Sequence, residues 1–320
     1  MSFYFNKQCE GIRRGFTLIE LLVVIVIIGI LASMAFVGGR AAINATRRGM
    51  INVQIKQVDM ALETYHQKYG EYPPDFSNEA DVLKHIRKRW PKFDWTVPNH
   101  DLQGFYQMIN DATPTEYKYD FANAGGKDKH FAALAFWLGG MPDTATGMLN
   151  GFSADVTNPL SATSQREEPM LELTIGDNCQ IVDGIPVLIA YKYPIAYFRS
   201  SMGNYLQKGI TPATPLKVNA QFSVPEWKTV TTNGNTPDSL GFCVPYAKSG
   251  ATSDDAIWHN PKRFQLIHPG LDGQFNNGSN NAVDVRVIDA TKDIRNANIT
   301  FADEDNQANF GGTTIDTTGN

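Results

Sequence analysis

The sequence predicts an α+β fold in which one long N-terminal helix packs on an antiparallel β-sheet head with long loop insertions. Residues 16–37 form an apolar run with a single acid, and residues 51–69 follow an amphipathic helical pattern. Short apolar runs later in the chain have the length of strands. These observations divide the chain into a leader over 1–15, a helix over 16–69 and a globular head over 70–320.

The apolar run over 16–37 is long enough to cross a membrane. As a helix it would span about 33 Å, which matches the hydrocarbon core of a bilayer. The leader before it carries Lys7, Arg13 and Arg14 against one acid, Glu10, a balance that favours keeping the leader in the cytoplasm. Long domains translocate largely regardless of charge. We therefore expect a single-pass inner-membrane protein whose head is periplasmic or extracellular.

One carboxylate, Glu20, lies near the start of this apolar run. An ionisable residue inside a membrane segment is costly and indicates function by default. An ordinary signal peptide, cut after 33–35 to leave Phe36 first, is one alternative, and a simple signal anchor is another. Neither explains the acid, nor the Gly15-Phe16 step directly after two arginines.

The stretch over 13–24 resembles the prepilin processing site of type IV pilins and type II secretion pseudopilins. The resemblance implies that prepilin peptidase, a membrane aspartyl peptidase, cuts between Gly15 and Phe16 and N-methylates Phe16. It also implies that Glu20 pairs with the N-terminal amine of a neighbouring subunit during assembly. The implied partners are other pilin or pseudopilin subunits in a helical polymer, the inner-membrane assembly machinery and membrane lipid.

An amphipathic stripe follows the membrane segment. Its members recur at helical spacing and share one face: Ile51, Ile55, Val58, Leu62, Tyr65 and Tyr69. Gly70 and the prolines at 73–74 predict the end of the helix. The string over 65–73 resembles the helix-to-head junction of the major pseudopilin of type II secretion.

The head is predicted from shorter patterns. Helices are expected over 80–89 and 101–110, and strands over 186–193, 195–198 and 263–267. Short turns between consecutive strands favour antiparallel pairing. The stretches 140–170, 200–240 and 273–300 are rich in turn-forming residues and are predicted to be long loops or insertions.

Two acidic segments near the C-terminus resemble the calcium loop of the major pseudopilin. They are residues 269–275, which contain Asp272, and residues 303–306, which contain Asp303 and Asp305. Carboxylate oxygens suit calcium, so the resemblance implies these three aspartates as ligands. About thirty residues separate the segments, whereas the family keeps them close. A solvated acidic turn is the alternative.

Cleavage of the leader would remove Cys9 and leave Cys179 and Cys243. Outside the cytoplasm a disulfide between these two is chemically permitted. Two buried free thiols are the alternative.

The net charge and the absence of certain sequence motifs argue against several classes of function. The formal net charge is −5, and loss of the leader makes it more negative, which argues against general nucleic-acid binding. The sequence contains no His-Glu-x-x-His, Cys-x-x-Cys or Gly-x-Ser-x-Gly pattern, and we expect neither an enzyme nor a required cofactor. We interpret the chain as a structural subunit of a type II secretion pseudopilus. The alternatives are a type IV pilus subunit or minor pilin for adhesion or DNA uptake, and a membrane-anchored enzyme.

Overall fold

The computed structural model describes most of the N-terminal helix and much of the head. The described residues are 16–76, 79–95, 102–112, 129–143, 146–161, 164–182, 185–201, 203, 205, 243, 245–249, 256–273, 275, 286–289, 294–295 and 306–310. The chain divides into two compact units, one ending at Thr46 and one beginning at Arg47. We describe each unit by itself.

The helices agree with the sequence prediction in three cases and add a fourth. They are α1 (Leu18–Tyr69), α2 (Glu79–Arg89), α3 (Leu102–Ala112) and α4 (Lys129–Leu134), with a π-helical turn, η1 (Ala135–Gly139), directly after α4. The predicted helices over 16–69, 80–89 and 101–110 are confirmed within two residues at each end. Neither α4 nor η1 was predicted from the sequence, because their short apolar run shows no clear helical period and ends in the glycine pair 139–140.

In the first unit α1 exposes an apolar surface. Every described side chain from Phe16 to Met34 is exposed, including most of the isoleucines, leucines and valines of this run. A helix of this length and composition can cross a membrane. We therefore expect lipid or another molecule to cover the apolar surface of this unit.

In the second unit the predicted stripe of α1 is confirmed as a core face. Ile51, Ile55, Val58, Leu62 and Tyr65 are at most 2% exposed. The helix stops where predicted, because Gly70 adopts a left-handed φ of 76° and its N–H donates to the carbonyl of His66 at 2.7 Å. This is the αL cap that glycine favours.

The head contains small sheets rather than one continuous sheet. One sheet has the order β1 (Pro142–Asp143), β2 (Met148–Leu149), β3 (Leu173–Thr174), and a second has β4 (Cys179–Val182), β5 (Ile185–Ala190), β6 (Tyr193–Pro194). A third has β13 (Gln307–Ala308), β10 (Phe264–His268), β7 (Ala196–Arg199). The fourth has β12 (Ile294–Arg295), β11 (Arg286–Asp289), β8 (Tyr246–Ser249), β9 (Ile257–Trp258).

Pairing within these sheets is antiparallel, as predicted, except that β8 and β11 are parallel. The predicted strands over 195–198 and 263–267 are β7 and β10, which pair through Tyr197 and Leu266. The predicted strand over 186–193 is instead two strands, β5 and β6, because a turn at Tyr191 and Lys192 folds it back on itself. In the described part of the predicted loop 140–170 the strands are the two-residue β1 and β2. Most of 200–240 and 273–300 lies outside the described residues.

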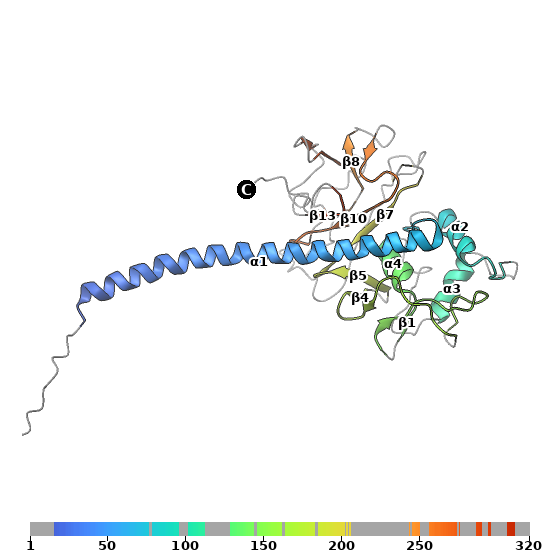
Figure 1. The fold of residues 1–320 in the computed structure, drawn as a ribbon, viewed down its shortest axis with the longest axis horizontal. Coiled ribbons are helices and arrows are strands. Elements are labelled where there is room, and N and C mark those ends of the chain that lie inside the picture. Colours follow the sequence, from blue (N-terminus) through green and yellow to red (C-terminus); the bar gives the residue numbers. More distant parts are fainter. Residues whose placement is uncertain are drawn as a thin grey trace, which may run out of the picture. The chain divides into compact units, whose positions relative to one another are not determined.

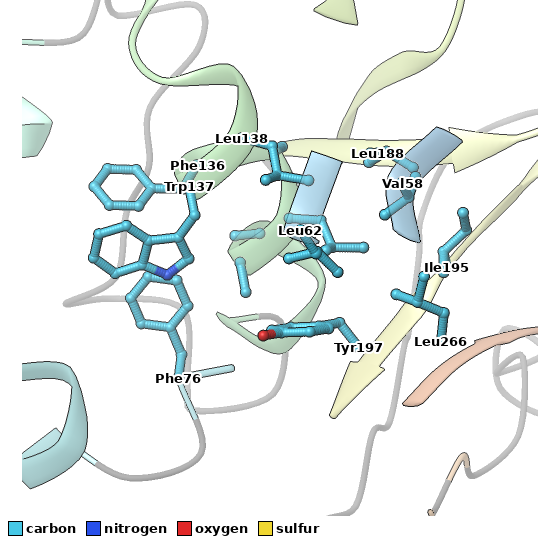
Figure 2. Close-up of a cluster of buried hydrophobic side chains, with 14 of the residues drawn as sticks. Val58, Leu62, Phe76, Phe136, Trp137, Leu138, Leu188, Ile195, Tyr197 and Leu266 are labelled. Atoms are coloured by element: carbon cyan, nitrogen blue, oxygen red, sulfur yellow. The ribbon is translucent and has the colours of Figure 1, made fainter. Parts of the chain in front are cut away.

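The second half of α1 contacts strands from two of these sheets (Figure 1). On one side Gln54 accepts the N–H of Tyr191, beside β5 and β6, at 2.8 Å. On the other side Arg263, next to β10, pairs with both Asp59 and Glu63. Figure 2 shows Val58 and Leu62 of α1 among apolar side chains of β5, β10 and η1. The helix is therefore the central element of the head core.

Buried polar groups tie the end of α1 to α2. The hydroxyl of Tyr65 lies 2.7 Å from Nε2 of His85, and Nδ1 of His85 lies 2.6 Å from Glu71. A neutral His85 satisfies both contacts by accepting from Tyr65 and donating to Glu71. Burial lowers the pKa of His85, and the hydrogen bond from His85 holds the pKa of Glu71 at about 2.

Candidate processing and assembly site

The candidate site is the N-terminal end of α1, where the sequence predicted Gly15, Phe16 and Glu20. Gly15 lies outside the described residues. Phe16 is 80% exposed, and it and Thr17 precede the first helical residue, Leu18. A peptide bond to be cut has to reach a peptidase in extended form, so a start of the helix after Phe16 suits processing there.

Thr17 and Glu20 cap the helix reciprocally. The backbone N–H and the hydroxyl of Thr17 each donate to Oε2 of Glu20 at 2.8 Å. In return the N–H of Glu20 lies 3.3 Å from the hydroxyl oxygen of Thr17. This is a capping box, in which two N–H groups that the helix leaves without partners are satisfied by side chains. The carboxylate also complements the positive end of the helix dipole.

The capping box fixes where the charge of Glu20 sits. Both hydrogen bonds from Thr17 go to the same oxygen, Oε2, and no hydrogen bond within the described part of the chain reaches Oε1. No described basic side chain forms an ion pair with this exposed carboxylate. Oε1 can therefore accept a hydrogen bond or ion pair from outside the subunit while Thr17 holds Oε2.

Thr17 was not among the residues predicted from the sequence. The signal was present, because threonine followed three residues later by glutamate before an apolar run is the pattern of a capping box. From the sequence, Glu20 was interpreted only as a charge within the membrane segment. Its second role, as a group that closes the end of its own helix, became visible in the hydrogen bonds.

The comparisons with known proteins point to the same end of the chain. Residues 12–36 match the family model described as the prokaryotic N-terminal methylation motif. The chain carries a prepilin-type methylation motif. No curated protein and no solved structure matches the chain.

The motif implies a pilin-like subunit that prepilin peptidase processes and that assembles into a polymer. Proteins of this kind are typically structural. Together with the exposed apolar surface of α1, the motif indicates a membrane-anchored pilin-like protein. The match covers the processing site and the membrane segment, and it does not extend into the head.

The predicted disulfide is corrected by the structure. No disulfide joins Cys179 and Cys243, and both side chains are fully buried. Cys179 lies on β4, opposite Leu188 of β5, whereas Cys243 lies shortly before β8 in a different sheet. Burial raises the pKa of the Cys179 thiol to about 12, so this thiol is an unreactive core group.

The predicted calcium ligands are only partly described. Asp272 is exposed in the turn after β10, and Asp303 and Asp305 lie outside the described residues. Within the described ranges no three acidic, histidine or cysteine side chains gather as metal ligands would.

Proposed function

We propose that the protein is a structural subunit of a type II secretion pseudopilus. Prepilin peptidase would cut between Gly15 and Phe16 and methylate the new amine. The observation that carries the proposal is the position of Glu20, the one acid of the apolar first segment of α1, at the capped start of the helix, where the methylation motif matches. The likeness of residues 65–73 to the major pseudopilin junction supports the choice of secretion.

Assembly would follow from the chemistry of two charges. Cleavage creates a positive amine on Phe16, one residue before the capping box. In lipid, that amine and the carboxylate of a neighbouring Glu20 are each costly alone, and an ion pair relieves both costs. Because Oε1 accepts no hydrogen bond from the described residues, the pair can form without breaking the cap. The ion pair would also fix the axial register of adjacent helices.

Amino-terminal analysis of the mature protein tests processing. After expression with prepilin peptidase, we expect a chain that begins with N-methyl-phenylalanine at Phe16, observed by mass spectrometry of the first tryptic peptide. Without the peptidase the leader should remain. A chain that begins at Phe36 would instead establish cleavage by an ordinary signal peptidase and end the proposal.

A second candidate is a minor or specialised subunit of a type IV pilus. The second unit, from Arg47 to the last residue, is large, and close packing of helices limits head width in a filament built from one subunit. Deletion of the gene separates the two functions. Loss of exoprotein secretion with normal surface pili would support the pseudopilus, whereas loss of pili with normal secretion would support the pilus.

We also propose that calcium binds the C-terminal turn through Asp272, Asp303 and Asp305. Thermal unfolding of the whole protein in detergent micelles tests this site. Calcium should raise Tm and a chelator should lower it, because a ligand that binds only the folded state stabilises that state. Asp272→Asn should reduce the calcium shift, and an unchanged Tm on chelation of the native protein would remove the proposal.

A further inference from the structure

Arg89, the last residue of α2, lies inside a cage of aromatic rings. Its guanidinium carbon is 4.4 to 5.7 Å from the ring centroids of Phe152, Tyr69, Trp90, Tyr65 and Trp137. These rings come from α1, from the residue directly after α2, from η1 and from the loop after β2. Cation–π contacts of this kind hold a guanidinium firmly without neutralising it.

The hydrogen bonds of Arg89 go to neutral hydroxyl groups and not to a carboxylate. Nη1 donates to the hydroxyl of Tyr65 at 2.9 Å, and Nη2 donates to the hydroxyl of Tyr69 at 3.2 Å. Among the described residues no acid forms an ion pair with Arg89. Two other half-buried arginines do have carboxylate partners. Arg263 pairs with Asp59 and Glu63, and Arg199 lies 3.9 Å from Glu71.

A small open cavity of about 140 Å³ lies beside the cage, and we name it the Arg89 pocket. Its lining includes two basic residues (Arg89 and Lys92), three apolar residues (Trp90, Ala154 and Val156) and one acid, Glu167. A cavity of about 150 Å³ is large enough for a benzene ring. The pocket can therefore hold one ring or one branched aliphatic side chain together with a charged head group.

The single acid of the pocket already has partners. Glu167 pairs with Lys68 at 3.0 Å and accepts the hydroxyl of Tyr69 at 3.3 Å. Lys92 is exposed and forms no ion pair with any residue that the structure describes. The basic groups of the pocket thus exceed its acids, and an anion is the ligand that the balance of charge favours.

We propose that the Arg89 pocket binds a carboxylate carried on a small apolar body. The fork of N–H groups on a guanidinium matches the two oxygens of a carboxylate, and the remaining N–H groups of Arg89 are available for them. Glu167 on the rim disfavours a second negative charge and so favours a carboxylate over a phosphate. Trp90 and Val156 would contact the apolar body.

Two sources carry this chemistry: the apolar C-terminal residue of a partner polypeptide, and a free small carboxylic acid. The two are told apart by whether a peptide bond next to the carboxylate improves binding. The proposal does not depend on the secretion function, because it rests only on groups of the head.

The experiment measures binding to the full-length protein in detergent micelles by calorimetry. The probes are 4-methylpentanoate and N-acetyl-leucine, which share the same apolar body and differ in the peptide bond, each compared with its own carboxamide so that partition into the micelle is subtracted. We expect millimolar or tighter binding of the carboxylates, and at least about tenfold weaker binding of the amides, because charged hydrogen bonds are lost. Tighter binding of N-acetyl-leucine than of 4-methylpentanoate would indicate a polypeptide end as the source, and the reverse order a free acid.

Arg89→Gln alone cannot decide the matter, because Arg89 also holds Tyr65 and Tyr69 and its loss can weaken the fold. Lys92→Glu is the decisive variant, since Lys92 is exposed and contacts no described acid. It should weaken carboxylate binding about fivefold or more while Tm stays unchanged. Lys262→Glu, at another exposed lysine, is the matched control and should leave binding unchanged. Equal binding of acid and amide, or no effect of Lys92→Glu, would overturn the proposal.

Discussion

The two halves of α1 both carry apolar side chains, but these side chains are shielded from water in different ways. From Phe16 to Met34 the helix exposes an apolar surface, whereas from Ile51 to Tyr65 it buries an apolar stripe that is at most 2% exposed. The head supplies the cover for the second half from the same chain. For the first half no cover is present among the described residues, so lipid and other subunits have to provide it. The second half of α1 therefore takes part in the folding of the head, and we expect the first half to act in assembly.

Replacement of Glu20 should have the largest effect, and the effect should fall on assembly and on the capped start of α1 but leave the head stable. Glu20→Ala removes the carboxylate that would pair with the amine of the next subunit, so we expect incorporation into filaments to drop to background. The head should unfold at an unchanged temperature, because Glu20 is exposed and, among the described residues, its carboxylate accepts hydrogen bonds from Thr17 alone. Filament pull-down with quantitative blotting measures the first effect, and circular dichroism measures the second.

Glu172→Ala, at an exposed acid in the head, is the matched control and should assemble normally. If Glu20→Ala subunits enter filaments at the level of the native protein, the ion pair is not the force that joins them.

Replacement of Leu62 should instead reduce the stability of the head. Leu62 is fully buried at the centre of the core, so Leu62→Ala should lower the free energy of unfolding of the head by about 2–5 kcal/mol. Denaturant unfolding in micelles, monitored by tryptophan fluorescence, measures the loss. Val53→Ala is the control on the outer face of the same helix, where the native side chain is 56% exposed, and it should change stability little.

Acidification should lower the stability of the head, which contains the second half of α1, without involving the membrane segment. His268 is fully buried, its Nε2 lies 2.9 Å from the carbonyl of Ala190, and its Nδ1 accepts the N–H of Gly270 at 3.1 Å. A proton on Nδ1 would therefore face another donor. Burial lowers the pKa of His268 to about 4, compared with 6.5 when it is free.

The unfolded state binds this proton more readily, so stability should be complete above about pH 6.5 and should fall as the pH drops toward 4. Between pH 7 and pH 5 we expect a loss of about 2 kcal/mol from His268. His85 acts in the same direction, because burial lowers its pKa too. His268→Gln should flatten part of this dependence, as urea titrations at each pH would reveal. An unchanged slope in His268→Gln would refute the assignment.

Loss of the capping hydroxyl should have the smallest effect. Thr17→Ala leaves the charge of Glu20 but removes the hydroxyl that donates to Oε2, so the first turn of α1 should open more often. We expect amide exchange at Glu20 and Leu21 to become about fivefold faster in micelles, with a modest reduction in assembly. Thr17→Ser retains the hydroxyl and should behave as the native protein. Equal protection in all three proteins would show that the cap does not hold the helix end.

Much of this molecule could be predicted from local patterns, for physical reasons. The spacing of Ile51, Ile55, Val58, Leu62 and Tyr65 specified the buried face of α1, because helical periodicity places these side chains together whatever covers them. Gly70 specified the end of the helix, since a residue without a side chain enters the left-handed region easily. The apolar run and the acid at Glu20 specified the membrane segment and its processing motif.

Only the tertiary structure decided features that depend on distant partners. Three such features are the division of the described strands among several sheets, the parallel pairing of β8 with β11, and the absence of a disulfide between Cys179 and Cys243. All three depend on contacts between segments far apart in the sequence. The cage around Arg89 is of the same kind, because its rings come from elements separated by more than eighty residues. A sequence pattern fixes the state of a residue when the neighbours that determine it are within a few positions along the chain. It cannot do so when folding has to bring those neighbours together.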